Sequence, residues 1–280
     1  MKNISLELKN HLSGELTMLA TCWKITRRDS VVMGFTSHDK SLSFDGVDYV
    51  ANSGFTPSDI KNSDSLEGDL FNLEGFLDSS FITESDLLAG KYDFAEIEIF
   101  QVNYADLTQG KIIHRTGWFG EISFDNGRFN AEISGLTSKL AKTIGDLYSP
   151  TCRAVLGDSR CSVSMAGYVV TGSVTGLTDN RVFADSSRVE DNGYFNYGKI
   201  TFTSGNNDGL SMEVKAYADG EIELVLPMSY AILIGDTYSL EVGCDKIIST
   251  CVAKFNNAVN FRGEPFVPGM DEILKTSSTK

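Results

Sequence analysis

Four of the five cysteines in this chain fall in two close pairs, Cys152 with Cys161 and Cys244 with Cys251. Eight residues separate the first pair, in TCRAVLGDSRC, and six separate the second pair, in GCDKIISTC. Thiolates are ligands for both zinc and iron–sulfur clusters. Two short loops that each supply two thiolates can converge on one centre. The spacing therefore predicts a single metal site held by all four thiols.

Several interpretations of the pairs compete. Burial as a small hydrophobic residue suits Cys22, in the strand-like ATCWKI, but charged and turn residues separate the paired thiols. Disulfides are disfavoured because the N-terminus has no secretory signal, which predicts folding in the reducing cytosol. Zinc sites usually place about two to four residues between paired ligands, whereas a 4Fe–4S cluster has corners that lie further apart. The spacing alone therefore favours neither zinc nor the cluster over the other.

Basic residues flank both pairs, in a chain with 24 lysines and arginines against 38 aspartates and glutamates. A centre with four thiolates carries net negative charge, and nearby cations lower the cost of that charge. The basic residues expected to do so are Arg153, Arg160, Lys246, Lys254 and Arg262.

The other polar residues do not form a convincing catalytic set. The histidines are His11, His38 and His114, and no G-x-S-x-G or H-E-x-x-H motif accompanies them. His38–Asp39 is the best acid–base candidate, although a turn that hydrogen-bonds its own neighbours explains it more simply. Carboxylates are abundant, but no spacing selects a glycosidase pair. We therefore predict no enzymatic activity and no catalytic residues.

The composition is that of an acidic globular chain. At 280 residues the chain is long enough for one large or two ordinary domains, and its net charge is −14. That charge argues against binding to DNA, RNA or an anionic membrane, because phosphate binding needs a basic face. No run of about eighteen apolar residues is present, so no membrane insertion is expected. Most of the acidity is interpreted as a solvated surface.

Strands joined by tight turns are expected to position the cysteines. LTMLATCWKITRR and AEIEIFQVN are rich in β-branched and aromatic residues, which favour strands. Alternating segments also flank dipeptides that tolerate the positive φ of two-residue hairpins. The three dipeptides that predict hairpins are Asp45–Gly46, Asn126–Gly127 and Asp219–Gly220.

Helices are expected to be few and short. Thr83 is a candidate N-cap for a helix of one or two turns that ends at Gly90. The segment SGLTSKLAKTIGDL has apolar residues at helical spacing and predicts a second helix, which Pro150 ends. Those apolar residues are Leu136, Leu140, Ile144 and Leu147.

A domain boundary is predicted just after this second helix. The chain is expected to be mainly β, with two β-rich, barrel-like domains and a few short helices. Residues 1–146 form the first domain. Residues 147–280 form the second, which is built around the four-cysteine site and contains an intervening β unit at about 162–243.

Four ordered segments carry a family resemblance. They are ATCWKITRRDSVVMGFTSHDKSLSFDGVDYVANSGF, LLAGKYDFAEIEIFQVNYAD, TCRAVLGDSRC and GCDKIISTCVAKFNNAVNFRGEPFVPGMD. From about Leu16 to Asp271, the chain resembles the tail-tip hub family of gene transfer agents and of siphophages of alphaproteobacteria. It is more distantly similar to the tail tip protein L of phage lambda, which has a much shorter stretch between the cysteine pairs.

The resemblance implies a mainly β protein with a 4Fe–4S cluster on Cys152, Cys161, Cys244 and Cys251. It implies a homotrimer around the tail axis, between a hexameric distal tail protein and a larger fibre or host-contact protein. The expected function is that of a structural hub of the tail tip, or baseplate, in a particle assembled in the bacterial cytoplasm. The cluster then has a structural role. The alternatives are a zinc-stabilised tail protein and a tail-tip hydrolase or redox enzyme.

DNA is expected to pass through such a hub without being bound. An acidic lumen would repel the passing phosphates and keep friction low. The candidate lumen residues are Asp64, Glu67 and Asp69.

Overall fold

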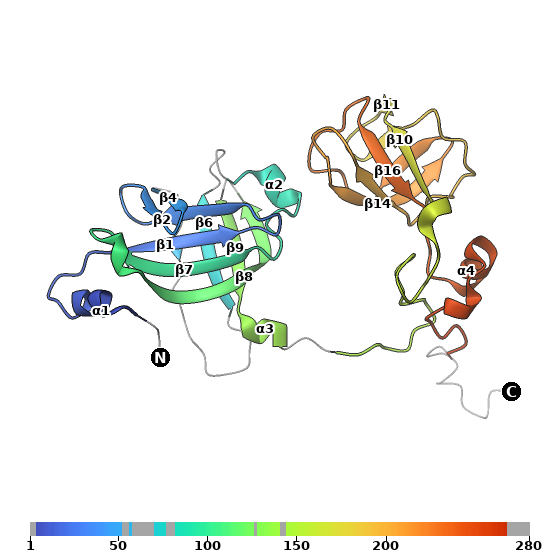
Figure 1. Cartoon of the computed structure of the whole chain (residues 1–280). Helices are drawn as coiled ribbons and strands as arrows, with labels where there is room; N and C mark the ends of the chain where they lie inside the picture. The colour runs from blue at the N-terminus through green and yellow to red at the C-terminus, as the bar shows by residue number, and fades with distance from the viewer. Residues whose placement is uncertain are drawn as a thin grey trace. The chain divides into compact units, whose positions relative to one another are not determined.

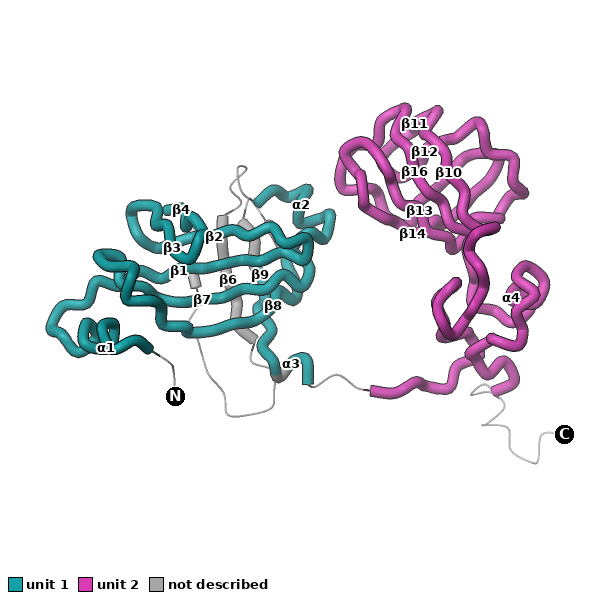
Figure 2. The backbone as a smooth tube through the Cα atoms, in the orientation of Figure 1, with its two compact units in different colours: residues 1–143 teal, residues 144–280 magenta. Residues whose placement is uncertain are grey.

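The computed structural model describes residues 4–51, 56–57, 70–76, 82–125, 128–140 and 144–267. The chain divides into two compact units, residues 1–143 and residues 144–280 (Figure 2). Strands dominate both units and the helices are short (Figure 1), which confirms the predicted mainly β class. Within the described residues, no helix combines the length and the apolar character needed to cross a membrane.

The first unit contains a nine-stranded sheet in the order β3-β4-β2-β1-β7-β8-β9-β6-β5. Neighbouring strands are antiparallel except β2 and β4, which are parallel. The strands are β1 (Leu19–Thr26), β2 (Val32–Thr36), β3 (Leu42–Phe44), β4 (Val47–Ala51), β5 (Thr56–Pro57), β6 (Leu70–Phe76), β7 (Glu96–Asn103), β8 (Lys111–Asp125) and β9 (Arg128–Ser134). The helices are α1 (Leu6–Leu12), α2 (Glu84–Leu88) and α3 (Leu136–Leu140), with a 3-10 turn at Leu107–Gln109.

Strand β1 shows why this sheet has two buried faces. Successive side chains of a strand point to opposite faces. Trp23 and Ile25 pack into one apolar cluster, and Ala20 and Cys22 pack into another. Cys22 is 1% exposed, as expected for a cysteine used as a small hydrophobic residue.

Interruptions in the strand register accompany the curvature of this sheet. The pairing of β7 with β8 shifts between Ile99 and Phe100, and that of β8 with β9 shifts between Phe119 and Ile122. Such bulges bend a strand and increase its twist. Side chains from β1, β2 and β7 thereby share one core with side chains from β8 and β9.

The predicted hairpins at Asp45–Gly46 and Asp219–Gly220 are confirmed. Asp45 and Gly46 have φ values of 51° and 73°, between β3 and β4. Asp219 and Gly220 have φ values of 50° and 83°, between β14 and β15. The third dipeptide, at residues 126–127, lies outside the described residues, and the flanking strands β8 and β9 pair as antiparallel neighbours.

The capped short helix is confirmed, and the longer helix prediction is wrong. The Thr83 side chain accepts from the backbone N–H of Asp86 at the start of α2, and Gly90 follows with a φ of 67°. Within the described residues, the second helix, α3, spans Leu136–Leu140. Residues 144–150 are not helical.

Exposure explains the short second helix. The apolar side chains of the pattern are largely exposed: Leu136 64%, Leu140 72%, Ile144 97% and Leu147 85%. Helices gain most of their stability in proteins from packing an apolar face, and this face packs against no core.

The second unit contains a seven-stranded antiparallel sheet in the order β10-β16-β13-β14-β15-β12-β11. Its strands are β10 (Val169–Ser173), β11 (Gly176–Leu177), β12 (Val182–Ala184), β13 (Lys199–Phe202), β14 (Ser211–Ala218), β15 (Glu221–Leu224) and β16 (Thr237–Glu241). The helix α4 (Ile248–Phe255) follows, with 3-10 turns at Met165–Gly167 and Ala258–Asn260. The core contains the fully buried Phe183, Phe195, Phe202, Tyr238 and Leu240.

The first and last strands of this unit in chain order, β10 and β16, are neighbours in the sheet. Val169, at the start of β10, pairs with Glu241, at the end of β16. The backbone N–H of Val242 donates to the carbonyl of Tyr168 over 2.9 Å. The chain therefore leaves the sheet beside the point where it entered (Figure 1). This pairing brings the segments before β10 and after β16, which carry the cysteine pairs, to the same end of the sheet.

Candidate metal centre

The four paired cysteines line one hollow in the second unit. The hollow is small, with a cavity volume of about 10 Å³. Cys161 and Cys251 are buried, with 9% and 8% exposure, and Cys152 and Cys244 are half-buried. The remaining lining is mostly apolar and comes from residues that include Ala154, Leu156, Val163, Phe255 and Phe261.

Three backbone hydrogen bonds tie together the segments around the hollow. The N–H of Cys152 donates to the carbonyl of Lys246 over 2.9 Å. The N–H of Arg153 donates to Arg262 over 3.1 Å, and that of Glu264 donates to Ser149 over 2.8 Å. The first cysteine loop is thus held between the second cysteine loop and the chain that follows α4.

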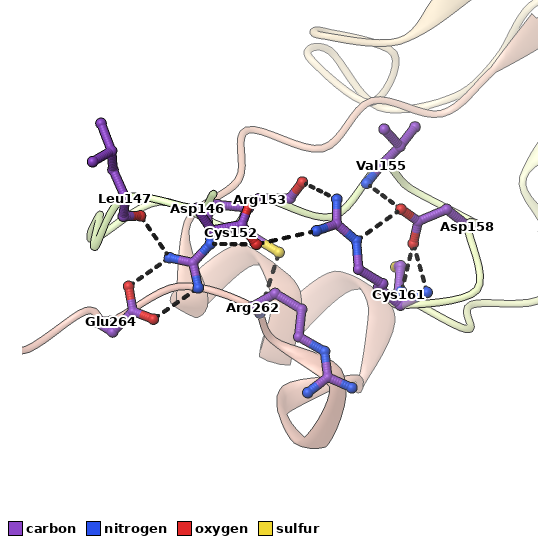
Figure 3. Close-up of polar contacts among 10 residues, drawn as sticks. Asp146, Leu147, Cys152, Arg153, Val155, Asp158, Cys161, Arg262 and Glu264 are labelled. Atoms are coloured by element: carbon purple, nitrogen blue, oxygen red, sulfur yellow. Dashed lines mark hydrogen bonds and ion pairs between the residues drawn. The ribbon is translucent and has the colours of Figure 1, made fainter. Parts of the chain in front are cut away.

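Asp158 shapes the loop that presents Cys161. Its carboxylate accepts from the backbone N–H groups of Val155 (2.9 Å), Arg160 (2.9 Å) and Cys161 (2.7 Å). These bonds, the one from Cys161 above all, lower the pKa of Asp158. The loop is therefore held by its own aspartate, as in an Asx turn, and Figure 3 shows these contacts.

Helix α4 presents Cys251 and packs against the β unit. The Asp245 carboxylate accepts from the Ile247 N–H (2.9 Å) and the Thr250 hydroxyl (2.7 Å), which fixes the first turn. At the other end of the helix, Phe255 joins the apolar core of the sheet. The helix therefore holds Cys251 at a fixed place relative to that core.

Two of the sulfur atoms accept N–H hydrogen bonds. The Arg262 backbone N–H lies 3.4 Å from the Cys152 Sγ, and the Asn257 Nδ2 lies 3.6 Å from the Cys161 Sγ. The Cys251 thiol instead donates to the carbonyl of Asn257 over 3.4 Å. Burial raises the pKa of the Cys251 thiol, and the neighbouring Cys244, Cys152 and Cys161 add to the rise. The four thiols are therefore close enough to influence one another electrostatically.

The basic residues of the two motifs have partners of their own. Arg153 forms a two-pronged ion pair with Glu264, with N–O distances of 2.6 and 2.9 Å (Figure 3). Arg160 donates to the carbonyl of Arg153 and lies 3.7 Å from Asp158. Both arginines are therefore paired with carboxylates, and the Cys152 sulfur also contributes to the raised pKa of Arg153. That they offset thiolate charge stays a prediction.

The two lysines bind backbone carbonyls. Lys246 donates to Ala154 over 2.6 Å, and Lys254 donates to Tyr194 over 2.6 Å and to Gly243 over 3.1 Å. Burial lowers the pKa of the Lys254 ammonium, against the opposing influence of Cys244. Lys254 thus connects α4 to the β unit and to the residue that precedes Cys244.

The thiols do not form a ready single-ion site. Across the described parts of both units, no group of three or more His, Cys, Asp or Glu side chains is arranged to hold one metal ion. The prediction of a second domain built around a four-cysteine metal or cluster site is therefore not shown by the described residues and stays a prediction. The structure has a hollow lined by four separate thiols.

Sequence reasoning missed three residues that organise this hollow, namely Asp158, Asn257 and Glu264. Asp158 had a usable signal, because an aspartate followed by a serine in a glycine-containing loop is typical of an Asx turn. Asn257 and Glu264 had none, since their partners lie about a hundred residues earlier in the chain.

The other candidates from the sequence do not gather into a site. His38 accepts at Nδ1 from the backbone N–H of Lys40 over 3.0 Å and contacts the ring of Tyr104, which fits the turn interpretation. The proposed lumen carboxylates Asp64, Glu67 and Asp69 lie outside the described residues.

Comparison with known proteins supplies the family. Residues 5–164, more than half of the chain, match the family described as baseplate hub protein, N-terminal attachment domain. The chain belongs to this baseplate hub family. Residues 193–271 of the hub-family chain also match a family described as phage conserved hypothetical protein BR0599.

A solved structure resembles the hub-family chain over almost its whole length. It is a chain in the virion of a native gene transfer agent particle, with 37% sequence identity and a TM-score of 0.80. The match covers 98% of the present chain and 97% of the other. No curated protein sequence matches significantly. The resemblance to a tail hub family of phages and gene transfer agents is confirmed.

Proposed function

We propose that this chain is a structural hub of the tail tip in a phage-like particle, and that its four paired cysteines hold a 4Fe–4S cluster. The observation that carries the proposal is the hollow lined by Cys152, Cys161, Cys244 and Cys251, in a member of the baseplate hub family. The cluster has a structural role. It ties the two cysteine loops together at one end of the β unit.

The residues of the hollow fit an iron–sulfur cluster. Four cysteine thiols are the usual ligand set, and an apolar lining with N–H donors to sulfur is typical of the surroundings that tune such clusters. Here Arg262 and Asn257 supply those donors. Membership of the hub family, together with gaps of eight and six residues within the pairs that are wide for zinc, supports a cluster with several metal corners over one zinc ion.

Anaerobic purification tests the cluster directly. The parent protein should be brown and should contain iron and inorganic sulfide in equal amounts. Serine at Cys152, Cys161, Cys244 or Cys251 should remove the visible absorbance or greatly reduce it. Alanine at Cys22, buried in the first unit, is the matched control and should leave the iron content unchanged. A colourless parent with zinc on four thiols would support the zinc alternative, and a quadruple serine variant that keeps its iron would contradict the proposal.

The proposed assembly is a homotrimer at the tail tip. It is supported by family membership and by the match to a chain of a gene transfer agent virion. The trimer would join a hexameric distal tail protein to a larger fibre or host-contact protein, and would surround the DNA exit channel. Homo-oligomers usually have closed point-group symmetry, and a threefold ring is one such form. Electron microscopy of the particle is the test, and one copy or six copies on the axis would contradict the trimer.

DNA is proposed to pass through the hub unbound. The net charge of −14 supports an acidic channel wall, which would repel phosphates. The surface potential of the assembled ring decides this point. A neutral or basic channel wall, with the acidic residues on the outer surface, would remove the proposed role of the charge. We propose no catalytic activity.

A further inference from the structure

One residue contacts a cysteine from each pair. Asn257 follows helix α4 and lines the same hollow as the thiols. Its side-chain Nδ2 donates to the Cys161 carbonyl over 2.6 Å and lies 3.6 Å from the Cys161 sulfur. Its backbone N–H donates to the Cys251 carbonyl over 3.1 Å, and its carbonyl accepts from the Cys251 thiol over 3.4 Å. Asn257 therefore bridges the two cysteine motifs through four contacts.

The orientation of the Asn257 amide is fixed by a neighbour. An amide side chain can be turned over, which exchanges its donor and its acceptor. The Cys161 carbonyl can only accept, so the group 2.6 Å from it is the Asn257 Nδ2. The Asn257 Oδ1 then accepts from the Asn260 Nδ2 over 2.8 Å. The Nδ2 group, with its two hydrogens, then faces the carbonyl and the sulfur of Cys161. The donor toward sulfur is thus set by the fold.

We propose that Asn257 is the positioning residue of the cysteine centre, and that its Nδ2 donates to the Cys161 sulfur when this sulfur is a ligand. The inference rests on the proposed cluster function and adds a role that the cysteine pattern does not contain. Asn257 sets the distance between Cys161 and Cys251. It also stabilises negative charge on one sulfur, and hydrogen bonds to sulfur are among the factors that set the potential of a cluster.

Two substitutions remove this donor in different ways. Asn257→Asp keeps the shape and adds a charge, whereas Asn257→Leu keeps the approximate size and adds none. Asn256→Asp is the matched control, since Asn256 is exposed, precedes Asn257 and receives the same added charge. Asn260→Leu removes the donor to the Asn257 Oδ1 and leaves Asn257 itself unchanged.

The parent and variants are compared as full chains under anaerobic conditions. Both Asn257 variants should release iron to a chelator about ten times faster than the parent or more, in line with the cost of losing residues that orient metal ligands. The reduction potential of the cluster that remains should shift to more negative values in both. A purely structural role would leave this potential unchanged. Asn260→Leu should show the same changes to a smaller extent, and Asn256→Asp should match the parent.

A second measurement tests the role of Asn257 independently of whether the chain contains a cluster. In the metal-free chain, both Asn257 variants should speed alkylation of Cys161 and Cys251 more than that of Cys152. This result would support the positioning role even if the parent proved to contain no iron. Parent-like iron release, potential and alkylation in both variants would overturn the inference. If both variants fail to fold, parent-like behaviour of Asn260→Leu would overturn it.

Discussion

At the scale of single residues, the pairing of Arg153 with Glu264 ties the first cysteine loop to the chain beyond α4. The guanidinium holds the Glu264 carboxylate with two hydrogen bonds, and the Ser149 N–H adds a third over 3.0 Å. The Arg153 bonds, followed by the Ser149 bond, lower the pKa of Glu264 to about 2. Glutamate in the unfolded chain has a pKa of about 4.3. The stability that the Glu264 carboxylate contributes is therefore fully present above this pH and is lost as pH falls through about 2.

A pH titration by NMR tests this pairing. The Glu264 carboxyl should titrate near 2 in the parent. Arg153→Met removes the main cause of the shift, so the pKa should rise toward about 4.3, the ordinary value for glutamate. Arg160→Met, which removes the neighbouring arginine of the same loop, should leave the Glu264 pKa low. A parent Glu264 that titrates near the ordinary value would refute the pairing.

Asp185 is a fully buried carboxylate in the core of the β unit. It accepts from the Tyr238 hydroxyl (2.6 Å), the Ser187 hydroxyl (2.6 Å) and the Ser173 N–H (3.2 Å). Burial alone would raise the pKa of Asp185, but the bonds from Ser187 and Tyr238 outweigh it and lower the pKa. Aspartate in the unfolded chain has a pKa of about 3.9. The Asp185 carboxylate therefore stabilises the fold above this pH, and the contribution is lost as pH falls below it.

Tyr238→Phe should lower the free energy of unfolding of the second unit by about 1.5–3 kcal/mol, the usual worth of a hydrogen bond to a charged group. Denaturant unfolding at neutral pH is the measurement. The deficit should shrink as pH falls below about 3.9, because a protonated Asp185 no longer offers an anionic acceptor. Tyr148→Phe, at a tyrosine that is 83% exposed, is the control and should have little effect. A Tyr238→Phe protein as stable as the parent at neutral pH would argue against this account of Asp185.

At the scale of elements, the chain leaves strand β16 through a very close backbone contact. A Cβ atom on Gly243 would lie 1.7 Å from the carbonyl oxygen of Asn196, and one on Gly198 would lie 2.2 Å from that of Glu241. These glycines allow the loop before β13 to pack directly on the segment that leads to Cys244. The position of Cys244 thus depends on a contact that any side chain at Gly243 would break.

Gly243→Ala should destabilise the second unit by about 3 kcal/mol or more, because the clashing atom is backbone and cannot rotate away. Thermal unfolding provides the measurement. Gly167→Ala is the matched control, since an added Cβ there meets nothing within 4 Å, and it should be close to neutral. Equal stability of the two variants would contradict the predicted contact.

At the scale of the whole molecule, the two compact units have separate apolar cores. All four paired cysteines belong to residues 144–280. Ligand binding stabilises only the part of a protein whose folded state forms the site. Loss of the proposed cluster should therefore affect the second unit and leave the first unchanged.

Removal of the cluster should produce this asymmetry in hydrogen exchange. Chelation, or serine at Cys161 and Cys251, should reduce protection of residues 144–267 by an amount equivalent to about 3 kcal/mol or more. Protection of residues 19–51 and 96–125 should stay at the parent level. Loss of protection in both sets of residues would show that the cores are coupled. Unchanged protection in both sets of residues would show that the cluster has no structural role.

Local chemistry made much of the fold predictable from sequence. Alternation of apolar residues indicated strands such as β1 and β7, and aspartate–glycine dipeptides located two hairpins. Thr83 and Gly90 located both ends of α2. Each of these signals depends on neighbours within a few residues of the chain. The helix predicted to continue through residues 144–150 failed because its stability depended on a packing surface that the local pattern does not report.

The sequence by itself determined the mainly β class, the family and the two cysteine pairs. Only the tertiary structure decided that the pairs line one hollow, because this depends on β10 and β16 being neighbours in the sheet. It also decided which polar residues organise the hollow. Glu264 reaches Arg153 and Asn257 reaches Cys161 across about a hundred residues. Such hydrogen bonds form only after the intervening chain has folded, so no local sequence pattern predicts them.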